Sequence, residues 1–345
     1  MKKLRKVAMM TDIHFGRQNN SETHNQDCIN FLEWFSTQVK NDPEIDGVFF
    51  LGDWHEHRAS INGLTLDYSE RGANILNELG KPVWMVVGNH DCYYRNSRDV
   101  YTTVIFEKLS NFILVDKPVI LENNSCVIAP YLFEEEYPEF FKKHSKYEVF
   151  AGHFEFKGFV LTGETAIKEH GPDPEDYGKP KRIFSGHYHR RQSKKNVHYI
   201  GNTFPADFSD ANDNKRGMAV YEFDTDTLDY IDWADCPKYI KTKLSELLAK
   251  PKKVLDQNAR VKVIVDQDIT LTENNEIRKL FAEKFNLREI VLEEQIDTSV
   301  QLTDIEKEVE DLKLEGVNEI VPELLKRVKS EKIVADKLVK IYRTL

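Results

Sequence analysis

The sequence has few cysteines and no long apolar run, and each scarcity excludes a class of protein. Four cysteines are scattered through 345 residues without a Cys-x-x-Cys pair, so neither a disulfide framework nor a structural zinc site is indicated. No apolar run approaches the roughly 18 residues that span a membrane. After the basic residues 1–6, only four apolar residues precede Thr11, too few for a secretion signal. We therefore expect a cytoplasmic protein without a membrane segment.

The acidic balance of the chain disfavours a nucleic-acid partner only at first sight. The net charge is −10, but the two signs are segregated along the sequence. Residues 179–195 hold seven basic side chains and no acidic one, whereas residues 289–319 hold eleven acidic side chains and two lysines. Because net charge averages over such segments, it does not exclude binding to DNA.

Five short motifs with metal-ligand side chains follow one another through the first 189 residues. Each follows a short run rich in valine, isoleucine and phenylalanine, which is typical of a buried strand. Since ligand sites of open α/β sheets lie at the carboxyl ends of the strands, the five motifs are expected to meet. One such motif alone would be read as a turn. The motifs are Asp12-Ile13-His14, Gly52-Asp53, Gly88-Asn89-His90-Asp91, Gly152-His153 and Gly186-His187-Tyr188-His189.

Side chains of these types suit a centre for two divalent metal ions. A phosphodiester resists hydrolysis because its negative charge repels nucleophiles and its alkoxide is a poor leaving group. Two metals about 3.5–4 Å apart acidify a bridging water to hydroxide and neutralise charge on the phosphoryl oxygens. Mixed nitrogen and oxygen ligands without cysteine favour manganese, iron or zinc. We expect two divalent ions, with manganese preferred and magnesium, iron or zinc also compatible.

Strands and helical patterns alternate over residues 1–235, which are expected to form the catalytic domain. Helices are predicted near residues 68–79 and 98–109, and the strands become shorter after residue 112. This pattern predicts an α/β fold of four layers, α/β/β/α, in which two sheets pack face to face with helices outside. One further helix is predicted by apolar residues at helical spacing, namely Cys28, Phe31, Leu32, Phe35 and Val39.

The rest of the chain is expected to form two smaller parts. Residues 236–298 predict an α+β module with strands at 260–265 and 290–292 and a helix at 275–285. Residues 299–345 combine an acidic linker with basic amphipathic helices. An apolar stripe behind such a linker is typical of a partner site. Its expected anchors are Val321, Leu324, Val328, Leu338 and Tyr342.

The motifs resemble those of the calcineurin-type metallophosphoesterases, and within them the SbcD/Mre family of nuclease subunits, particularly the bacteriophage recombination nucleases. The resemblance spans the chain and is specific over residues 7–223. It implies the four-layer metallophosphoesterase sandwich, with residues 236–298 as a capping or DNA-recognition module. Further likeness lies in Gly152-His153-Phe154-Glu155 followed by Gly158-Phe159, in Tyr199-Ile200-Gly201-Asn202 and in Arg216-Gly217.

The resemblance also implies a role for each motif residue. His90 would act as the general acid or as a cation that contacts phosphate, oriented by Asp91. Glu56 departs from the family, because many relatives have histidine or aspartate three residues after the bridging aspartate. One metal would be held by Asp12, His14, Asp53 and His189, and the other by Asp53, Asn89, His153 and His187, with Asp53 as the bridge.

The function implied is that of a metal-dependent DNA exonuclease or endonuclease, a subunit of an SbcCD/Mre-Rad-type recombination and repair complex, with a metal-bridging hydroxide as nucleophile. The expected partners are DNA, an ABC-type ATPase with a coiled coil of the SbcC/Rad kind, and a second copy of the chain. A homodimer would pair through the predicted helix 98–109. If a bacteriophage encodes the chain, its location is the host cytoplasm. Phosphate contacts are expected from Arg190, Arg191, Lys194 and Lys195.

Two other functions fit parts of the pattern. A small-molecule or cyclic-nucleotide phosphodiesterase of the same superfamily would use the same metal centre, but it would not need residues 236–345. A non-catalytic scaffold would be expected to lose ligands or the general acid, whereas all seven ligands and His90 are present.

Overall fold

The first sheet carries three of the five motifs. The computed structural model describes residues 2–160, 168–169, 171–177 and 180–294. Strands β1 to β4 of this sheet run parallel, and β11 and β12 extend it antiparallel beyond β1. In spatial order its strands are β12 (Thr227–Asp232), β11 (Gly217–Glu222), β1 (Lys6–Met10), β2 (Ile45–Phe50), β3 (Val83–Val86) and β4 (Phe112–Val115).

The second sheet carries the other two motifs. Strands β6, β7, β8 and β10 are parallel neighbours, and β5 and β9 pair antiparallel at the two edges. Its strands, in spatial order, are β5 (Val119–Leu121), β6 (Cys126–Ala129), β7 (Val149–Gly152), β8 (Arg182–Ser185), β10 (Val197–Tyr199) and β9 (Gln192–Lys194).

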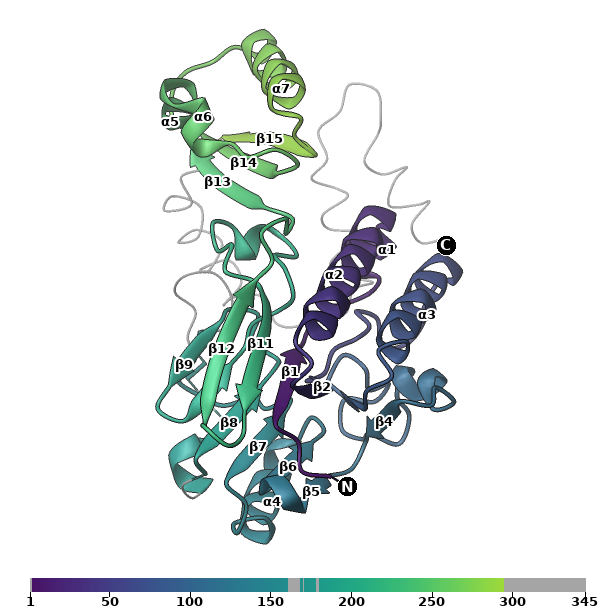
Figure 1. The fold of residues 1–345 in the computed structure, drawn as a ribbon. Coiled ribbons are helices and arrows are strands. Elements are labelled where there is room, and N and C mark those ends of the chain that lie inside the picture. The colour runs from purple at the N-terminus through teal and green to yellow at the C-terminus, as the bar shows by residue number, and fades with distance from the viewer. Residues whose placement is uncertain (1, 161–167, 170, 178–179, 295–345) are drawn as a thin grey trace, which may run out of the picture. The chain divides into compact units, whose positions relative to one another are not determined.

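Helices cover the outer faces of the two sheets. On the first sheet lie α2 (Glu22–Asn41) and α3 (Gly63–Asn77), which pack side by side (Figure 1). Helix α4 (Tyr137–Lys143) covers the second sheet. A single turn, α1 (Arg17–Asn20), precedes α2, and short 3₁₀ helices occupy Thr102–Phe106, Glu122–Asn124, Glu134–Glu136, Pro174–Tyr177 and Phe208–Asp210.

Alternation along the central strands explains the four layers. In β1, Ala8 and Met10 face the core beneath α2 and α3, whereas Val7 and Met9 face the core between the sheets. Successive strand residues point to opposite faces, so a strand covered on both sides must be apolar throughout. The predicted α/β/β/α fold is therefore confirmed, and so is the apolar face of α2, which is buried from Cys28 to Val39.

A third, smaller sheet follows the sandwich. Strands β13 (Tyr239–Lys243) and β14 (Arg260–Val265) pair in parallel. The sheet also contains β15 (Glu289–Glu294), and helices α5 (Leu244–Ala249), α6 (Pro251–Val254) and α7 (Leu271–Phe285) accompany it. Arg288 forms two hydrogen bonds of 2.6 and 2.9 Å with buried Asp27 of α2. The domain boundaries at residues 235 and 298 stay predictions, and the expected C-terminal helices lie outside the described residues.

The predicted helix at 98–109 is wrong, because only the 3₁₀ helix Thr102–Phe106 forms there. Its residues include a β-branched run, which has low helix propensity. The hydroxyl of Thr102 also contacts the ring of His55, and Leu109 packs against the core. Val104 and Ile105 remain exposed, at 45% and 47%. The proposed dimer surface therefore retains two of its apolar residues but not its helix.

Candidate metal centre

The two sheets bring the five motifs together at the carboxyl ends of their strands. Asp12 and His14 follow β1, Asp53 follows β2, and Asn89 and His90 follow β3. From the second sheet, His153 follows β7, while His187 and His189 follow β8. Because neighbouring parallel strands end at the same edge, each sheet delivers its ligands to one side of the sandwich.

One group of side chains gathers around Asn89. The Nε2 atom of His153 lies 2.9 Å from Asn89 Oδ1 and 3.4 Å from Asp53 Oδ2. The Nδ1 atom of His187 lies 2.9 Å from the same oxygen of Asn89. These four residues are the set predicted for one metal ion.

A second group gathers around Asp12. His14 Nε2 lies 3.7 Å from Asp12 Oδ1, and His189 Nε2 lies 4.0 Å from that oxygen. The same nitrogen of His14 is 3.8 Å from Asp53 Oδ2, the oxygen that faces His153. Asp53 therefore lies between the two groups, where a bridging carboxylate is required, and the assignment of individual ligands stays a prediction.

The residues fit divalent cations because they are buried, and because one of them, His14, lacks hydrogen-bond partners in the described residues. Asp12, His14, Asp53 and His153 are each at most 2% exposed. Within the described residues, both ring nitrogens of His14 lack a hydrogen-bond partner, although Nδ1 lies 2.8 Å from Glu56 Oε2 outside hydrogen-bond geometry. A buried imidazole without partners is costly, and a bound cation would supply one. These side chains could therefore hold metal ions.

Protons would compete with metal ions for this centre. Burial lowers the pKa of His14, but Asp12, Glu56 and Asp53 together raise it to about 10. Burial likewise raises the pKa of Asp53, yet the positive charge and hydrogen bond of His153 hold it well below its usual range. Carboxylates that stabilise imidazolium this strongly would bind metal ions in exchange for protons.

The backbone at the centre adopts left-handed conformations that side chains disfavour. Asp12, His14, Asp53 and His187 have φ values of 53°, 52°, 60° and 86°. Each such residue costs on the order of 1–3 kcal/mol, and residues of this kind cluster at functional sites. Gly88 completes the turn geometry, because a Cβ atom there would clash with the carboxylate of Asp53.

Asp91 stabilises the turns that carry the ligands rather than the ring of His90. Its carboxylate accepts N–H bonds from Asp53, Trp54, His55 and Gly88 at 3.0–3.2 Å. Burial and the negative charge of Asp53 raise its pKa to about 7. A cation beside Asp53 would offset that charge. The expectation that Asp91 orients His90 is thus replaced by a backbone role.

The ring of His90 is held by a carbonyl group instead. Its Nδ1 atom lies 2.9 Å from the carbonyl oxygen of Glu56, which can only accept, so Nδ1 carries a proton. The N–H group of His90 donates to Asp53 Oδ1 at 2.8 Å. Nε2 is thereby left to exchange a proton.

Glu56 is a site residue for which no role could be predicted from the sequence. Besides its approach to His14, its carboxylate lies 3.5 Å from Arg17, which pairs with Asp207 at 2.6 Å. The sequence marks Glu56 only by its position three residues after Asp53, where many relatives have histidine or aspartate. Among the described residues, His14, Glu56 and His90 also form a third group that could hold a metal ion.

The neighbouring histidines have structural roles. His55 is buried between the hydroxyls of Thr102 and Ser69, at 2.9 and 2.7 Å, and burial lowers its pKa to about 3. His24 contacts the carbonyl oxygen of His14 at 3.0 Å, and burial lowers its pKa to about 4. Both rings are therefore neutral near neutral pH.

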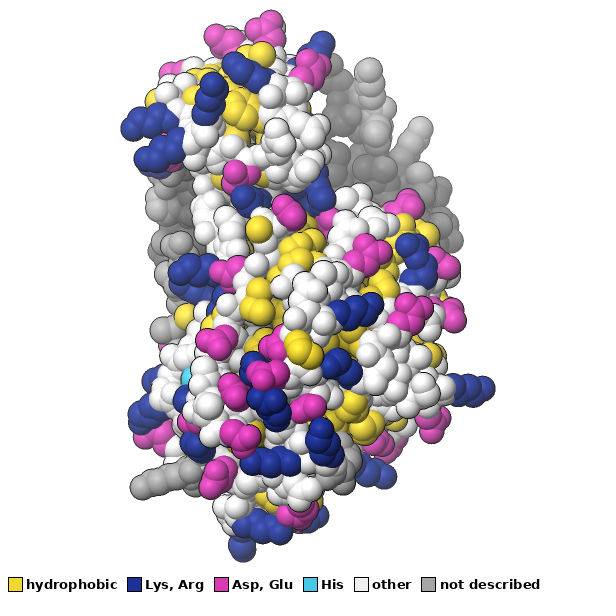
Figure 2. All heavy atoms as spheres, viewed as in Figure 1, with side chains coloured by type: hydrophobic (Ala, Val, Ile, Leu, Met, Phe, Trp, Pro, Cys, Tyr) yellow, Lys and Arg dark blue, Asp and Glu magenta, His cyan; other side chains and the backbone are white. Residues whose placement is uncertain are grey.

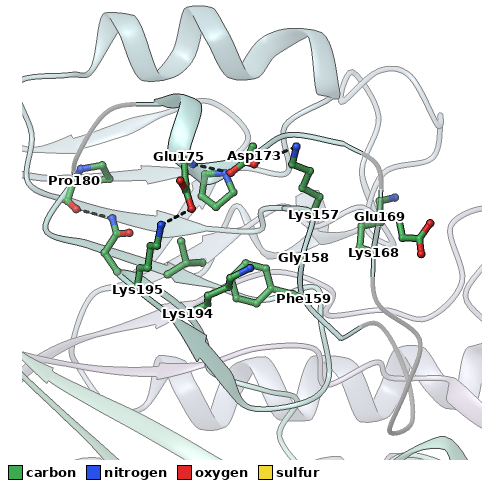
Figure 3. Close-up of a pocket in the computed structure, with 13 residues that line it drawn as sticks. Lys157, Gly158, Phe159, Lys168, Glu169, Asp173, Glu175, Pro180, Lys194 and Lys195 are labelled. Carbon is green, nitrogen blue, oxygen red and sulfur yellow. Dashed lines mark hydrogen bonds and ion pairs between the residues drawn. The ribbon is translucent and has the colours of Figure 1, made fainter.

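The basic run after β8 divides into paired and unpaired side chains. Arg191 pairs with Asp232 at 2.6 Å and lies 4.3 Å above the ring of Tyr230. Lys195 pairs with Glu175 beside a cavity of about 620 Å³, which Lys194 also lines (Figure 3). Arg190 and Lys194 are exposed and have no ion-pair partner within the described part of the chain.

The expected partner-binding residues Val321, Leu324, Val328, Leu338 and Tyr342 lie outside the described residues. Where the chain is described, no helix is both long and apolar enough to cross a membrane.

The chain is similar to known proteins over the residues that carry this centre. The model of the calcineurin-like phosphoesterase family matches residues 5–191. Exonuclease subunit 1 of Enterobacteria phage T4 is 29% identical over 185 residues, which cover 52% of this chain and 54% of that protein. The chain thus matches about half the length of this relative.

Two solved structures are similar to this chain at lower sequence identity. A nuclease MPE from Pseudomonas putida is 13% identical, with a TM-score of 0.31, over 63% of this chain and 84% of that one. The purple acid phosphatase PPD1 of yellow lupin (Lupinus luteus) is 14% identical, with a TM-score of 0.39, over 67% and 53% of the two chains.

The position of Asp53 between the two groups predicts the effect of Asp53→Asn on metal content. An amide cannot bridge two cations, so the variant should lose at least one of about two bound manganese ions per chain. Metal analysis after dialysis would measure this, with Asp229→Asn on exposed β12 as the matched control. Equal metal content in Asp53→Asn and the wild type would refute the bridging assignment.

Proposed function

Because the chain belongs to the calcineurin-like phosphoesterase family, we propose that it is a metal-dependent nuclease that hydrolyses phosphodiester bonds of DNA. The observation that carries the proposal is the position of Asp53, which lies within 4 Å of histidines from both ligand groups. Two cations held there would polarise the phosphoryl oxygens and activate water. The T4 relative is named an exonuclease subunit, which supports DNA as the substrate.

The side chains of the centre have distinct tasks in this reaction. The carboxylates of Asp12 and Asp53 would bind and orient the cations, and the four N–H bonds to Asp91 keep the turn around Asp53 rigid. His90 would act as the general acid in its doubly protonated form: the carbonyl of Glu56 retains the proton on Nδ1, and the proton on Nε2 would pass to the leaving alkoxide.

The experiment that tests the proposal compares two substrates. Purified protein with manganese should cleave labelled DNA with a much higher kcat/KM than a small chromogenic diester, and a chelator should stop both reactions. Efficient turnover of the small diester without cleavage of DNA would favour the small-molecule phosphodiesterase instead.

A general-acid role for His90 predicts that its removal affects the chemical step and not metal binding. His90→Ala should retain the wild-type metal content while its cleavage rate falls roughly 10²–10⁴-fold, the usual contribution of a general acid. Single-turnover rates and metal analysis of the same preparation would measure both. Loss of a metal ion from His90→Ala would show that His90 is a ligand, as in the group with His14 and Glu56.

We propose that Arg190, Arg191, Lys194 and Lys195 contact DNA. Within the described residues, two of these four side chains form ion pairs and two do not. Lysine and arginine side chains are interspersed with acidic ones on the face shown in Figure 2. Arg190 and Lys194 are exposed without ion pairs in the described residues, whereas Arg191 and Lys195 are paired.

Replacing Arg190 and Lys194 together with alanine should weaken DNA binding equally for all sequences. Two lost phosphate contacts would reduce the slope of log affinity against log salt by roughly 1 to 2. Fluorescence anisotropy over a salt series would measure this, and the pair Lys142→Ala and Lys143→Ala on α4 is the control. If the slope of log affinity against log salt were the same for the variant and the wild type, these side chains would not contact DNA and would belong to a solvated loop.

We further propose that the chain works with an ATPase subunit in an SbcCD/Mre-Rad-type complex and forms a homodimer. The T4 relative is named a subunit, and the spacing of the apolar residues at 321–342 in the sequence is the pattern expected of a docking helix. Exposed Val104 and Ile105 offer a surface for the second copy. A cytoplasmic location stays a prediction.

Deletion of residues 320–345 tests the docking helix. The truncated chain should no longer co-purify with the ABC-type ATPase, yet it should still cleave short single strands in a metal-dependent manner at nearly the wild-type rate. Unfolding of the truncated chain, or loss of all cleavage, would mean that the segment belongs to the catalytic core.

A further inference from the structure

A cavity of about 510 Å³ adjoins the metal centre. The residues of its outer wall take no part in the reaction proposed above. Asn89, His90 and His187 line it on the side of the centre. The volume lies within the roughly 300–1,000 Å³ that is usual for small-ligand sites. The outer wall is formed in part by Arg58, Tyr94, Arg95, Tyr131 and Phe133.

The two arginines of this wall are free to bind an anion. Arg58 is half-buried and Arg95 is exposed, and neither lies within ion-pair distance of a carboxylate anywhere in the described ranges. Nearby Arg98, in contrast, binds both carboxylate oxygens of Glu136 at 2.6 Å. A free guanidinium group matches the geometry of a phosphate and can bind it through two hydrogen bonds.

The aromatic residues of the wall are held in place on one side and exposed on the other. The hydroxyl of Tyr131 donates to Glu155 at 3.2 Å, and its ring meets Phe133 edge to face at 5.6 Å. The guanidinium of Arg98 lies 5.0 Å over the ring of Phe133. Tyr94 is 47% exposed. Exposed rings beside unpaired arginines are the features with which proteins bind unstacked nucleotides.

We propose that this cavity is a nucleotide subsite, in which one unstacked base packs against Tyr94 and Phe133 while a flanking phosphate binds Arg58 and Arg95. The inference rests on the proposed nuclease function, since the nucleotide must adjoin the phosphodiester that lies beside His90. A base within a duplex is stacked and paired, so it must leave the helix to reach these rings. Cleavage therefore depends on the base next to the scissile bond.

An abasic series tests the subsite. A short single-stranded oligodeoxynucleotide and its derivatives, with one abasic residue moved stepwise past the cleavage position, are cleaved by the wild type with manganese. At one register the kcat/KM should fall roughly 5- to 100-fold, the contribution of one stacked base. Tyr94→Ala should reduce that dependence to less than about twofold, whereas Tyr94→Phe, which keeps the ring, should retain it.

The arginines are tested with the intact oligonucleotide. Arg58→Ala combined with Arg95→Ala should raise KM about tenfold or more, as the loss of charge-assisted phosphate contacts does. Arg71→Ala, an exposed arginine on α3, is the matched control and should equal the wild type.

The outcomes separate the subsite from the nuclease function. Equal cleavage of all abasic derivatives by the wild type, or an undiminished abasic effect in Tyr94→Ala, would overturn the subsite and leave the nuclease intact. If the wild type cleaves no oligonucleotide but hydrolyses the chromogenic diester, the nuclease function fails and the subsite fails with it.

Discussion

The burial of Asp53 between two groups of histidines is the constraint on which the centre depends. Its carboxylate lies 3.4 Å from His153 and 3.8 Å from His14, and it is 2% exposed. A carboxylate so placed is stable only with positive charge on both sides. Protonated histidines can supply that charge in the absence of metal, and in the proposed reaction two divalent cations would supply it.

The four-layer architecture serves this one arrangement. Two sheets are needed because His14 and Asp53 follow strands of the first, whereas His153 follows a strand of the second. The apolar core between the sheets holds their carboxyl ends together. The N–H bonds accepted by Asp91 offset part of the backbone strain at Asp53. Core packing thus supports the unfavourable conformations at the centre.

The alternation of strands and helical patterns was sufficient to predict the sandwich, and the convergence of the ligands could be predicted because each motif follows an apolar strand. The helix expected at 98–109 failed since β-branched residues and a contact with His55 favour a 3₁₀ turn. The role of Asp91 was also missed, because backbone hydrogen bonds leave no pattern in a sequence. Glu56 could be located but not interpreted, since its contacts with His14 and Arg17 arise only on folding.

Anomalous diffraction from crystals soaked with manganese would show directly whether Asp53 bridges two cations. We expect two manganese peaks about 3.5–4 Å apart, each within coordination distance of the Asp53 carboxylate. One peak would lie among Asp12, His14 and His189, and the other among Asn89, His153 and His187. A single peak, or a peak bound by His14, Glu56 and His90 away from Asp53, would contradict the account.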